Sequence, residues 1–89
     1  MREDKVFKAI SDKNRRKIIS LLRKRDMTAG EIADQFNISK PSVSEHLKIL
    51  KNADLINSEK RGQYIIYFLN LTILQEIVTY FLQITAGDN

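Results

Sequence analysis

The chain has 89 residues, a formal net charge of +4 and no cysteine, and these facts limit what it can be. It is long enough for one small, marginally stable domain over residues 1–89, without disulfides or thiolate metal sites. No run of about 18 apolar residues exists, so we expect no membrane insertion. Because residues 1–10 also lack the apolar core of a signal peptide, a cytoplasmic location is expected.

The first part of the chain is predicted to be helical and basic. Residues 5–10 show a short amphipathic pattern, and Ser11 or Asp12 can cap a second helix over about 13–25. Lysine and arginine are concentrated in this part of the chain and are absent from residues 62–89. Such a basic segment suits a polyanionic partner, although a solvated helix face is the alternative interpretation.

Residues 28–53 are the most informative segment. Thr28 and Glu31 have the spacing of a capping box, so a helix is expected to begin there. Asn37 tolerates left-handed backbone and suits the following turn, and Ser39 can cap the next helix. Two short helices joined by a tight turn are typical of a helix-turn-helix, whose second helix lies in the major groove of DNA.

The second of these helices has one apolar side and one polar side. Val43, Leu47 and Leu50 repeat at i, i+4 and i+7 and predict a buried stripe. The residues that face away from the stripe are Lys40, Ser42, Ser44, Glu45, Lys48 and Lys51. Short hydrogen-bonding groups come first and cations follow, as contacts with base edges and then phosphates require.

Two strands are expected next, over residues 55–59 and 63–69, with Gly62 in the turn between them. A hairpin after a helix-turn-helix is a wing, so residues 55–69 are predicted to form a two-stranded wing. Lys60 and Arg61 at its tip either reach a minor groove or the flanking phosphates, or only keep a turn soluble.

Residues 71–84 are expected to form a last helix that is apolar around well over half of its circumference. The chain is too small to bury such a helix, so we predict that it packs against a second subunit together with residues 5–10 of both chains. The predicted interface residues are Val6, Phe7, Ile10, Leu74, Ile77, Val78 and Phe81.

The order helix, helix, helix-turn-helix, hairpin, helix resembles the ArsR-type winged helix-turn-helix repressors. The resemblance is specific as a set and extends over roughly residues 5–84. The matching strings are Phe7–Asp12 with Arg15–Ile19 for the opening helices, Met27–Ala33 for the first motif helix, Ser39–Leu50 for the recognition helix, and Arg61–Gln63 with Tyr67 and Leu69 for the wing.

The resemblance implies a mainly α (α+β) winged fold and a homodimer, joined through its terminal helices, that represses transcription from a pseudo-palindromic operator. It also implies two sets of DNA-binding residues. Those expected to read bases are Lys40, Ser42, Ser44 and Glu45. Those expected to contact phosphates or to act from the wing are Ser39, Lys48, Lys51, Lys60, Arg61 and Gln63.

Many members of that family sense metals through cysteine or histidine clusters, and this sequence departs from that pattern. Residues 28–35 and 71–84, where the clusters would lie, contain neither residue type, and His46 is the only histidine. One imidazole per subunit is too few for a transition-metal site, so we predict no metal site and no cofactor. The chain therefore resembles the metal-free members, some of which control their own operon and some of which a regulatory protein partner releases.

Catalysis is not expected. Ser44, Glu45 and His46 are adjacent on a helix, where neighbouring side chains diverge, so they cannot form a triad. The sole histidine is instead expected to bond a neighbouring group or a phosphate. The alternative function is a winged-helix protein-interaction module that uses the apolar last helix and binds little DNA.

Overall fold

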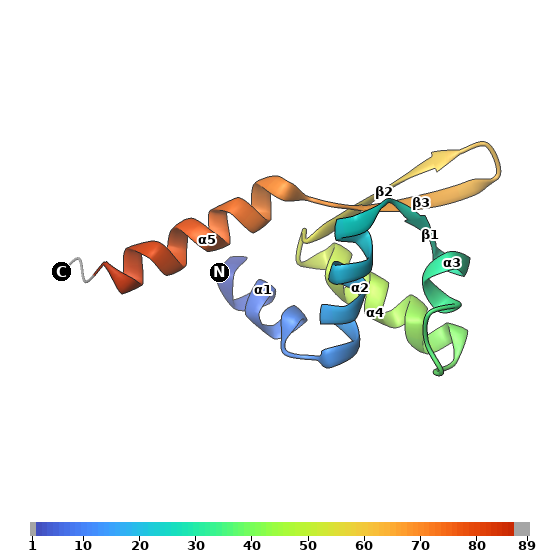
Figure 1. Cartoon of the computed structure of the whole chain (residues 1–89), viewed down its shortest axis with the longest axis horizontal. Coiled ribbons are helices and arrows are strands. Elements are labelled where there is room, and N and C mark those ends of the chain that lie inside the picture. The colour runs from blue at the N-terminus through green and yellow to red at the C-terminus, as the bar shows by residue number, and fades with distance from the viewer. Residues whose placement is uncertain (1, 87–89) are drawn as a thin grey trace.

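Residues 2–86 are described by the structure, a computed structural model, in which helices surround the base of a small sheet (Figure 1). The molecule extends 50 × 26 × 22 Å, because α5 projects from one end and the β2–β3 hairpin from the other (Figure 1). The elements are α1 (Arg2–Ile10), α2 (Lys13–Lys24), β1 (Met27–Thr28), α3 (Ala29–Ala33), α4 (Lys40–Asn52), β2 (Ile56–Arg61), β3 (Tyr64–Leu69) and α5 (Leu71–Thr85).

Side chains cap the helices where the sequence predicts helix starts. Asp12 begins α2, since its Oδ1 accepts the backbone N–H of the second helical residue at 2.7 Å. The capping box of α3 is complete, because Thr28 Oγ1 accepts the Glu31 N–H at 3.0 Å and Glu31 Oε1 accepts the Thr28 N–H at 2.8 Å. Ser39 begins α4 by accepting the N–H of Ser42 at 3.2 Å. These predicted helix starts are confirmed.

The core lies where α1, α2, α3 and α4 meet the base of the hairpin and the start of α5. Val43, Leu47 and Leu50 of α4 are at most 2 % exposed, which confirms the predicted stripe. The other large residues of the core, outside α4, are Val6, Ile18, Leu22, Met27, Ile32, Leu55, Ile56, Ile73 and Ile77.

The sheet has three antiparallel strands in the order β1–β3–β2, one more than the predicted two-stranded wing. The hairpin register runs from Ile56 opposite Leu69 to Arg61 opposite Tyr64, and Gly62 takes the left-handed φ of 62° in the tight turn. β1 is only two residues long, too short to carry an alternating pattern, so its pairing with β3 could not be read from the sequence. This pairing anchors the hairpin at the start of the helix-turn-helix.

Among the described residues, the non-glycine residue with left-handed backbone is Asp54, with φ of 61°, and not Asn37 as its residue type predicted. The chain reverses abruptly after α4, where the N–H of Asp54 donates to Lys51 at 3.0 Å and the N–H of Leu55 donates to Leu50 at 3.1 Å. This pair of bonds is a Schellman motif, which requires left-handed backbone at its central residue. The expectation for Asn37 was wrong because the turn before α4 needs no positive φ.

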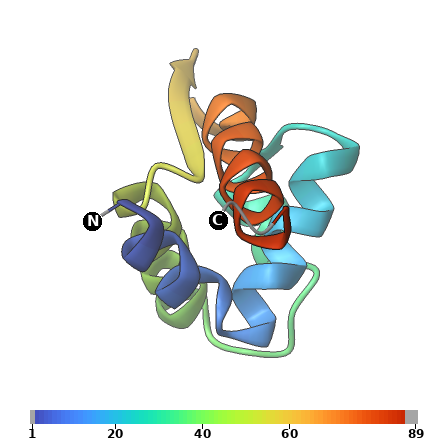
Figure 2. The same ribbon diagram turned by 90° about the vertical axis from the view of Figure 1, so that its left-hand side faces the viewer.

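α1 and α5 lie side by side at the end of the molecule opposite the hairpin tip (Figures 1 and 2). The Phe7 ring of α1 packs against Tyr80 and Phe81 of α5, with centroid separations of 5.8 and 5.4 Å. Arg2 pairs with Glu76 at 2.8 Å across the same two helices. Within residues 2–86, none of the helices combines the length and apolar character that crossing a membrane would need.

Candidate nucleic-acid interface

The start of α4 and the tip of the hairpin lie toward the same end of the molecule (Figure 1). α4 buries its apolar stripe and leaves its polar residues in solvent. All of the α4 residues that were predicted to contact DNA are exposed, namely Lys40, Ser42, Ser44, Glu45, Lys48 and Lys51.

These polar residues do not share one side of α4. Residues two apart are separated by about 200° around an α-helix, so Ser42 and Ser44 point in nearly opposite directions. Ser44 and Lys40 line a shallow hollow against α3. The Ser42 hydroxyl instead accepts a hydrogen bond from the N-cap Ser39 at 2.9 Å. The structure therefore groups Ser44 with Lys40 and places Ser42 on the other flank.

The two cations in the second half of α4 have different surroundings. Lys51 Nζ donates to Ser58 Oγ at 2.7 Å, so this side chain connects α4 with β2 at the base of the wing. For Lys48, no hydrogen bond or ion pair occurs within the described part of the chain, and its side chain lies in solvent. Lys48 is thus the better placed of the two to reach a phosphate.

At the wing tip, Lys60, Arg61 and Gln63 are all exposed, as a contact with DNA requires. Arg61 donates to Glu59 Oε1 from Nε at 3.0 Å and from Nη2 at 2.5 Å, and Nη2 also lies 3.9 Å from Asp26. The hydrogen bonds to Glu59, followed by its charge and that of Asp26, raise the pKa of Arg61 above its ordinary value. Considering residues 2–86 only, Lys60 has no such ion pair and its charge is not offset by a neighbouring acid.

Cations of α2 bond to backbone carbonyls of the protein itself. Arg16 Nη1 donates to Ile10 O at 2.8 Å, and Lys17 Nζ donates to Gln35 O at 2.6 Å while lying 4.6 Å from the centre of the Phe36 ring. Part of the positive charge of the N-terminal segment therefore has a structural role, because these cations bind the backbone of neighbouring helices and loops.

His46 is partly buried, and its Nδ1 lies 3.2 Å from Arg15 Nη1 of α2. The expectation that the imidazole bonds a neighbouring group is confirmed. The Arg15–His46 contact itself was missed, since the two residues are 31 positions apart and belong to separate motifs. No group of three histidine, cysteine or acidic residues within residues 2–86 is arranged to hold a metal ion.

The predicted interface residues of the terminal helices divide into buried and exposed groups. Val6 is 1 % exposed and Ile77 is 8 % exposed, so both pack within the chain and cannot form the outer contact predicted for them. Phe7, Ile10 and Leu74 are half-buried against the core. Val78 and Phe81 are 57 % and 48 % exposed. The sequence pattern could not tell the two apolar sides of α5 apart, because only the fold shows which side meets the core.

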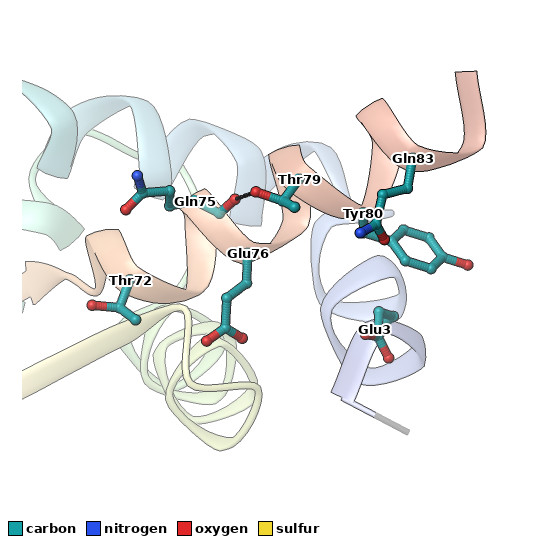
Figure 3. A pocket seen from close by; sticks show the side chains of 7 residues that line it. All are labelled: Glu3, Thr72, Gln75, Glu76, Thr79, Tyr80 and Gln83. Carbon is teal, nitrogen blue, oxygen red and sulfur yellow. Dashed lines mark hydrogen bonds between the residues drawn. The ribbon is translucent and has the colours of Figure 1, made fainter. Parts of the chain in front are cut away.

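α5 has three sides. Ile73 and Ile77 face the core, while a second apolar side is exposed and includes Leu71 and Leu82, which the interface prediction missed. The third side is polar and, with Glu3 of α1, lines an open hollow of about 420 Å³ (Figure 3). The residues of this polar strip are Thr72, Gln75, Glu76, Thr79 and Gln83.

A capped helix-turn-helix followed by a β-hairpin defines a DNA-binding protein of the winged helix-turn-helix class. The family model described as bacterial regulatory protein, arsR family, matches residues 12–58. The chain belongs to the ArsR family. It is 58 % identical over 85 residues to the transcriptional repressor SdpR of Bacillus subtilis (strain 168), an alignment that covers 94 % of both chains.

Solved structures support the same assignment of fold. An ArsR-like transcriptional regulator from Rhodococcus sp. RHA1 superposes with a TM-score of 0.88 at 28 % identity, over 96 % of this chain and 80 % of that one. The homodimeric winged helix-turn-helix DNA-binding domain Mb0332 from Mycobacterium bovis superposes with a TM-score of 0.74 at 20 % identity, over 92 % and 82 % of the two chains. The chain is thus a DNA-binding transcriptional repressor of the ArsR family and not an enzyme.

Proposed function

We propose that the chain acts as a homodimer that represses transcription by binding a pseudo-palindromic operator, and that it does so without a metal. The observation that carries this proposal is the separation of two surfaces in one elongated domain. α5, which has an exposed apolar side, lies toward one end, and the start of α4 and the wing tip lie toward the other (Figure 1).

The apolar side supports the homodimer. Leu71, Val78 and Leu82 are all more than half exposed, and exposed apolar residues grouped on one helix indicate a protein contact. A second copy would bring its own α5 to the same place, because a twofold interface uses the same patch on both partners. The homodimeric state of the Mycobacterium bovis neighbour supports the same arrangement.

At the end of the molecule that holds the start of α4 and the wing tip, different side chains are proposed to make different contacts with DNA. Lys40, Ser44 and Glu45 are proposed to contact base edges, because all three are exposed in the first half of α4, which lies toward the same end of the molecule as the wing tip. Lys48 and Lys60 are proposed to contact phosphates, since neither side chain has an ion pair with another of the residues 2–86. Ser42 is a weaker candidate for base contact than Ser44, because its hydroxyl already bonds Ser39.

The remaining predicted DNA contacts are proposed to act less directly. Ser39 holds the first turn of α4, and Lys51 joins α4 to the wing through Ser58. Arg61 and Gln63 are exposed at the wing tip, where Glu59 holds the Arg61 guanidinium and so limits its contact with a phosphate.

A metal-independent mechanism is proposed from the ligands that the sequence supplies. The chain has no cysteine, and its single histidine bonds Arg15 through Nδ1. A transition-metal sensor site needs several nitrogen or sulfur ligands. Operator binding is therefore expected to be unchanged by Zn²⁺ or by a chelator.

Selection of bound sequences from random duplex DNA tests the proposal directly. An inverted repeat with half-sites about one helical turn apart, or a multiple of this, is expected. The purified protein should be a dimer by size exclusion with light scattering. Affinity should fall with salt by roughly 0.9 log units per log unit of salt for each phosphate contacted. A monomer that selects no sequence would contradict the proposal and favour the protein-interaction module.

A further inference from the structure

Arg15 of α2 connects two other helices through one guanidinium group. Its Nε donates to Ala9 O at 2.5 Å and its Nη2 donates to Lys8 O at 3.3 Å, both in the last turn of α1. Its Nη1 lies 3.2 Å from Nδ1 of His46 in α4. A single partly buried side chain therefore joins α1, α2 and α4.

The chemistry of the three contacts is well matched. The last carbonyls of a helix lack partners within the helix and lie at its negative end, so they favour a cation. Arginine is always protonated and only donates, so Nδ1 of His46 must accept and the ring proton must lie on Nε2. A planar guanidinium can serve three acceptors at once, which a lysine ammonium on a flexible stem cannot do in the same geometry.

Arg16, the next residue, provides an internal contrast. Its side chain caps the same end of α1 through Ile10 O at 2.8 Å, but this is the one hydrogen bond that the side chain makes within residues 2–86, and it does not reach α4. The connection to α4 is thus particular to Arg15.

We propose that Arg15 is a positioning residue that, through His46, sets the orientation of α4 relative to α1. The inference rests on the dimeric operator binding proposed above, in which α1 and α5 lie at the dimer end and α4 enters the major groove. A rotation of α4 against α1 would change the distance between the two reading helices of the dimer. The Arg15–His46 contact therefore determines how strictly the dimer selects the spacing of its half-sites.

The test compares affinities for two duplexes, the selected operator and the same operator with one base pair inserted between the half-sites. The insertion moves the half-sites apart by roughly 3.4 Å and turns them by roughly 35°. The wild-type protein should strongly prefer the original spacing. In Arg15→Ala and Arg15→Lys this preference should fall about tenfold, with the dimer retained by light scattering. Arg16→Ala should keep the wild-type preference.

Substitutions of His46 test the contact from the α4 side and leave the cap of α1 in place. His46→Ala should relax spacing selection as Arg15→Ala does. His46→Asn should restore it, because the asparagine Oδ1 can accept from Arg15 where Nδ1 does. This pair also keeps the test decisive if Arg15→Ala folds poorly.

The outcomes separate the inference from the proposed function. If His46→Ala weakens binding to both duplexes equally, the imidazole contacts DNA and the positioning role is wrong. If Arg15→Ala and Arg16→Ala behave alike, Arg15 only caps α1 and the inference fails while operator binding stands. A wild-type protein that is indifferent to spacing contradicts the dimeric operator mode and the inference together.

Discussion

α4 and α5 are alike on the side that faces the core, which is apolar in both, and differ in the polarity of the side that faces outward. Each helix buries apolar residues on one side, Leu47 and Leu50 in α4 and Ile73 and Ile77 in α5. The outer side of α4 carries short polar groups and lysines, whereas α5 exposes a second apolar side and no basic residue. The inner side of each helix is therefore determined by the packing of the fold, and its outer side indicates the kind of partner that the helix can bind. A polar outer side suits solvent or a polyanion, and an apolar one suits another protein surface.

The largest expected effect comes from placing a charge on the apolar side of α5. Val78→Glu should dissociate the dimer and weaken operator binding by at least about a hundredfold, because a twofold interface would bury the unpaired charge twice. Light scattering and gel-shift titration measure the two effects. Gln83→Glu, on the polar strip of the same helix and about 100° or more around the helix from Leu71, Val78 and Leu82, adds the same charge and should leave both unchanged. If both variants remain dimeric, the exposed apolar side is not the interface.

A smaller effect is expected on the outer side of α4. Ser44→Ala should reduce the preference for operator over random duplex by about 1 kcal/mol, the lower end of the range for losing one base contact. Ser42→Ala should reduce it less, since that hydroxyl bonds Ser39. Competition gel shifts with operator and random DNA measure the preference. Equal losses on both DNAs for Ser44→Ala would show that Ser44 has no role in reading bases.

The wing should show an effect on affinity without one on specificity. Lys60→Ala should lower the slope of log K against log salt by about 0.9, the value for one phosphate contact. Arg61→Ala should change it less, because Glu59 already holds the guanidinium. Salt titrations of both variants, on operator and on random DNA, measure the two slopes. The reverse ranking would mean that Arg61 leaves Glu59 when DNA binds.

The smallest effect on DNA binding is expected from Asp12, which lies on neither surface and changes only stability. Asp12→Ala should reduce the free energy of unfolding by about 1 kcal/mol through loss of the α2 cap. Burial opposes ionisation of Asp12, but the N–H bonds from Arg15 and Asn14 and the nearby positive charge, including that of Arg15, outweigh it. The pKa of Asp12 is therefore lowered from its ordinary value of 3.8.

A lowered pKa in the folded state fixes the sign of the pH dependence. The ionised carboxylate stabilises the fold above the unfolded pKa, and this contribution is lost as pH falls through the lower folded pKa. Urea unfolding between pH 7 and about pH 3 should show the loss in the wild type. Asp12→Asn keeps a capping group and should remove this part of the dependence. A wild-type profile that matches Asp12→Asn would contradict the assignment.

Much of the fold follows from short stretches of sequence. The caps at Thr28 and Ser39 and the buried repeat of Val43, Leu47 and Leu50 depend on residues within a turn or two of one another. Gly62 places the hairpin turn in the same way, through the backbone freedom of a single residue. The order of these elements was enough to indicate the winged helix-turn-helix class.

The candidate site was only partly predictable for the same reason. A list of polar residues on α4 is local information, but the side to which each one points depends on where the core lies. The structure thereby separated Ser42 from Ser44 and drew Lys51 toward Ser58. It also showed that Arg61 is hydrogen-bonded to Glu59, whereas the sequence suggested that both cations at the wing tip were unpaired.

Because caps, turns and apolar periods act over a few residues, the sequence was enough to predict the starts of α2, α3, α4 and α5, the hairpin and the class of protein. The first helix was predicted over residues 5–10, but in the structure α1 begins at Arg2. Three features became visible only in the tertiary structure: the third strand at β1, the burial of Val6 and Ile77, and the contact of Arg15 with His46. Each of these depends on packing between segments far apart in the chain. Such contacts exist only once the core has brought the segments together, so no local pattern carries their signal.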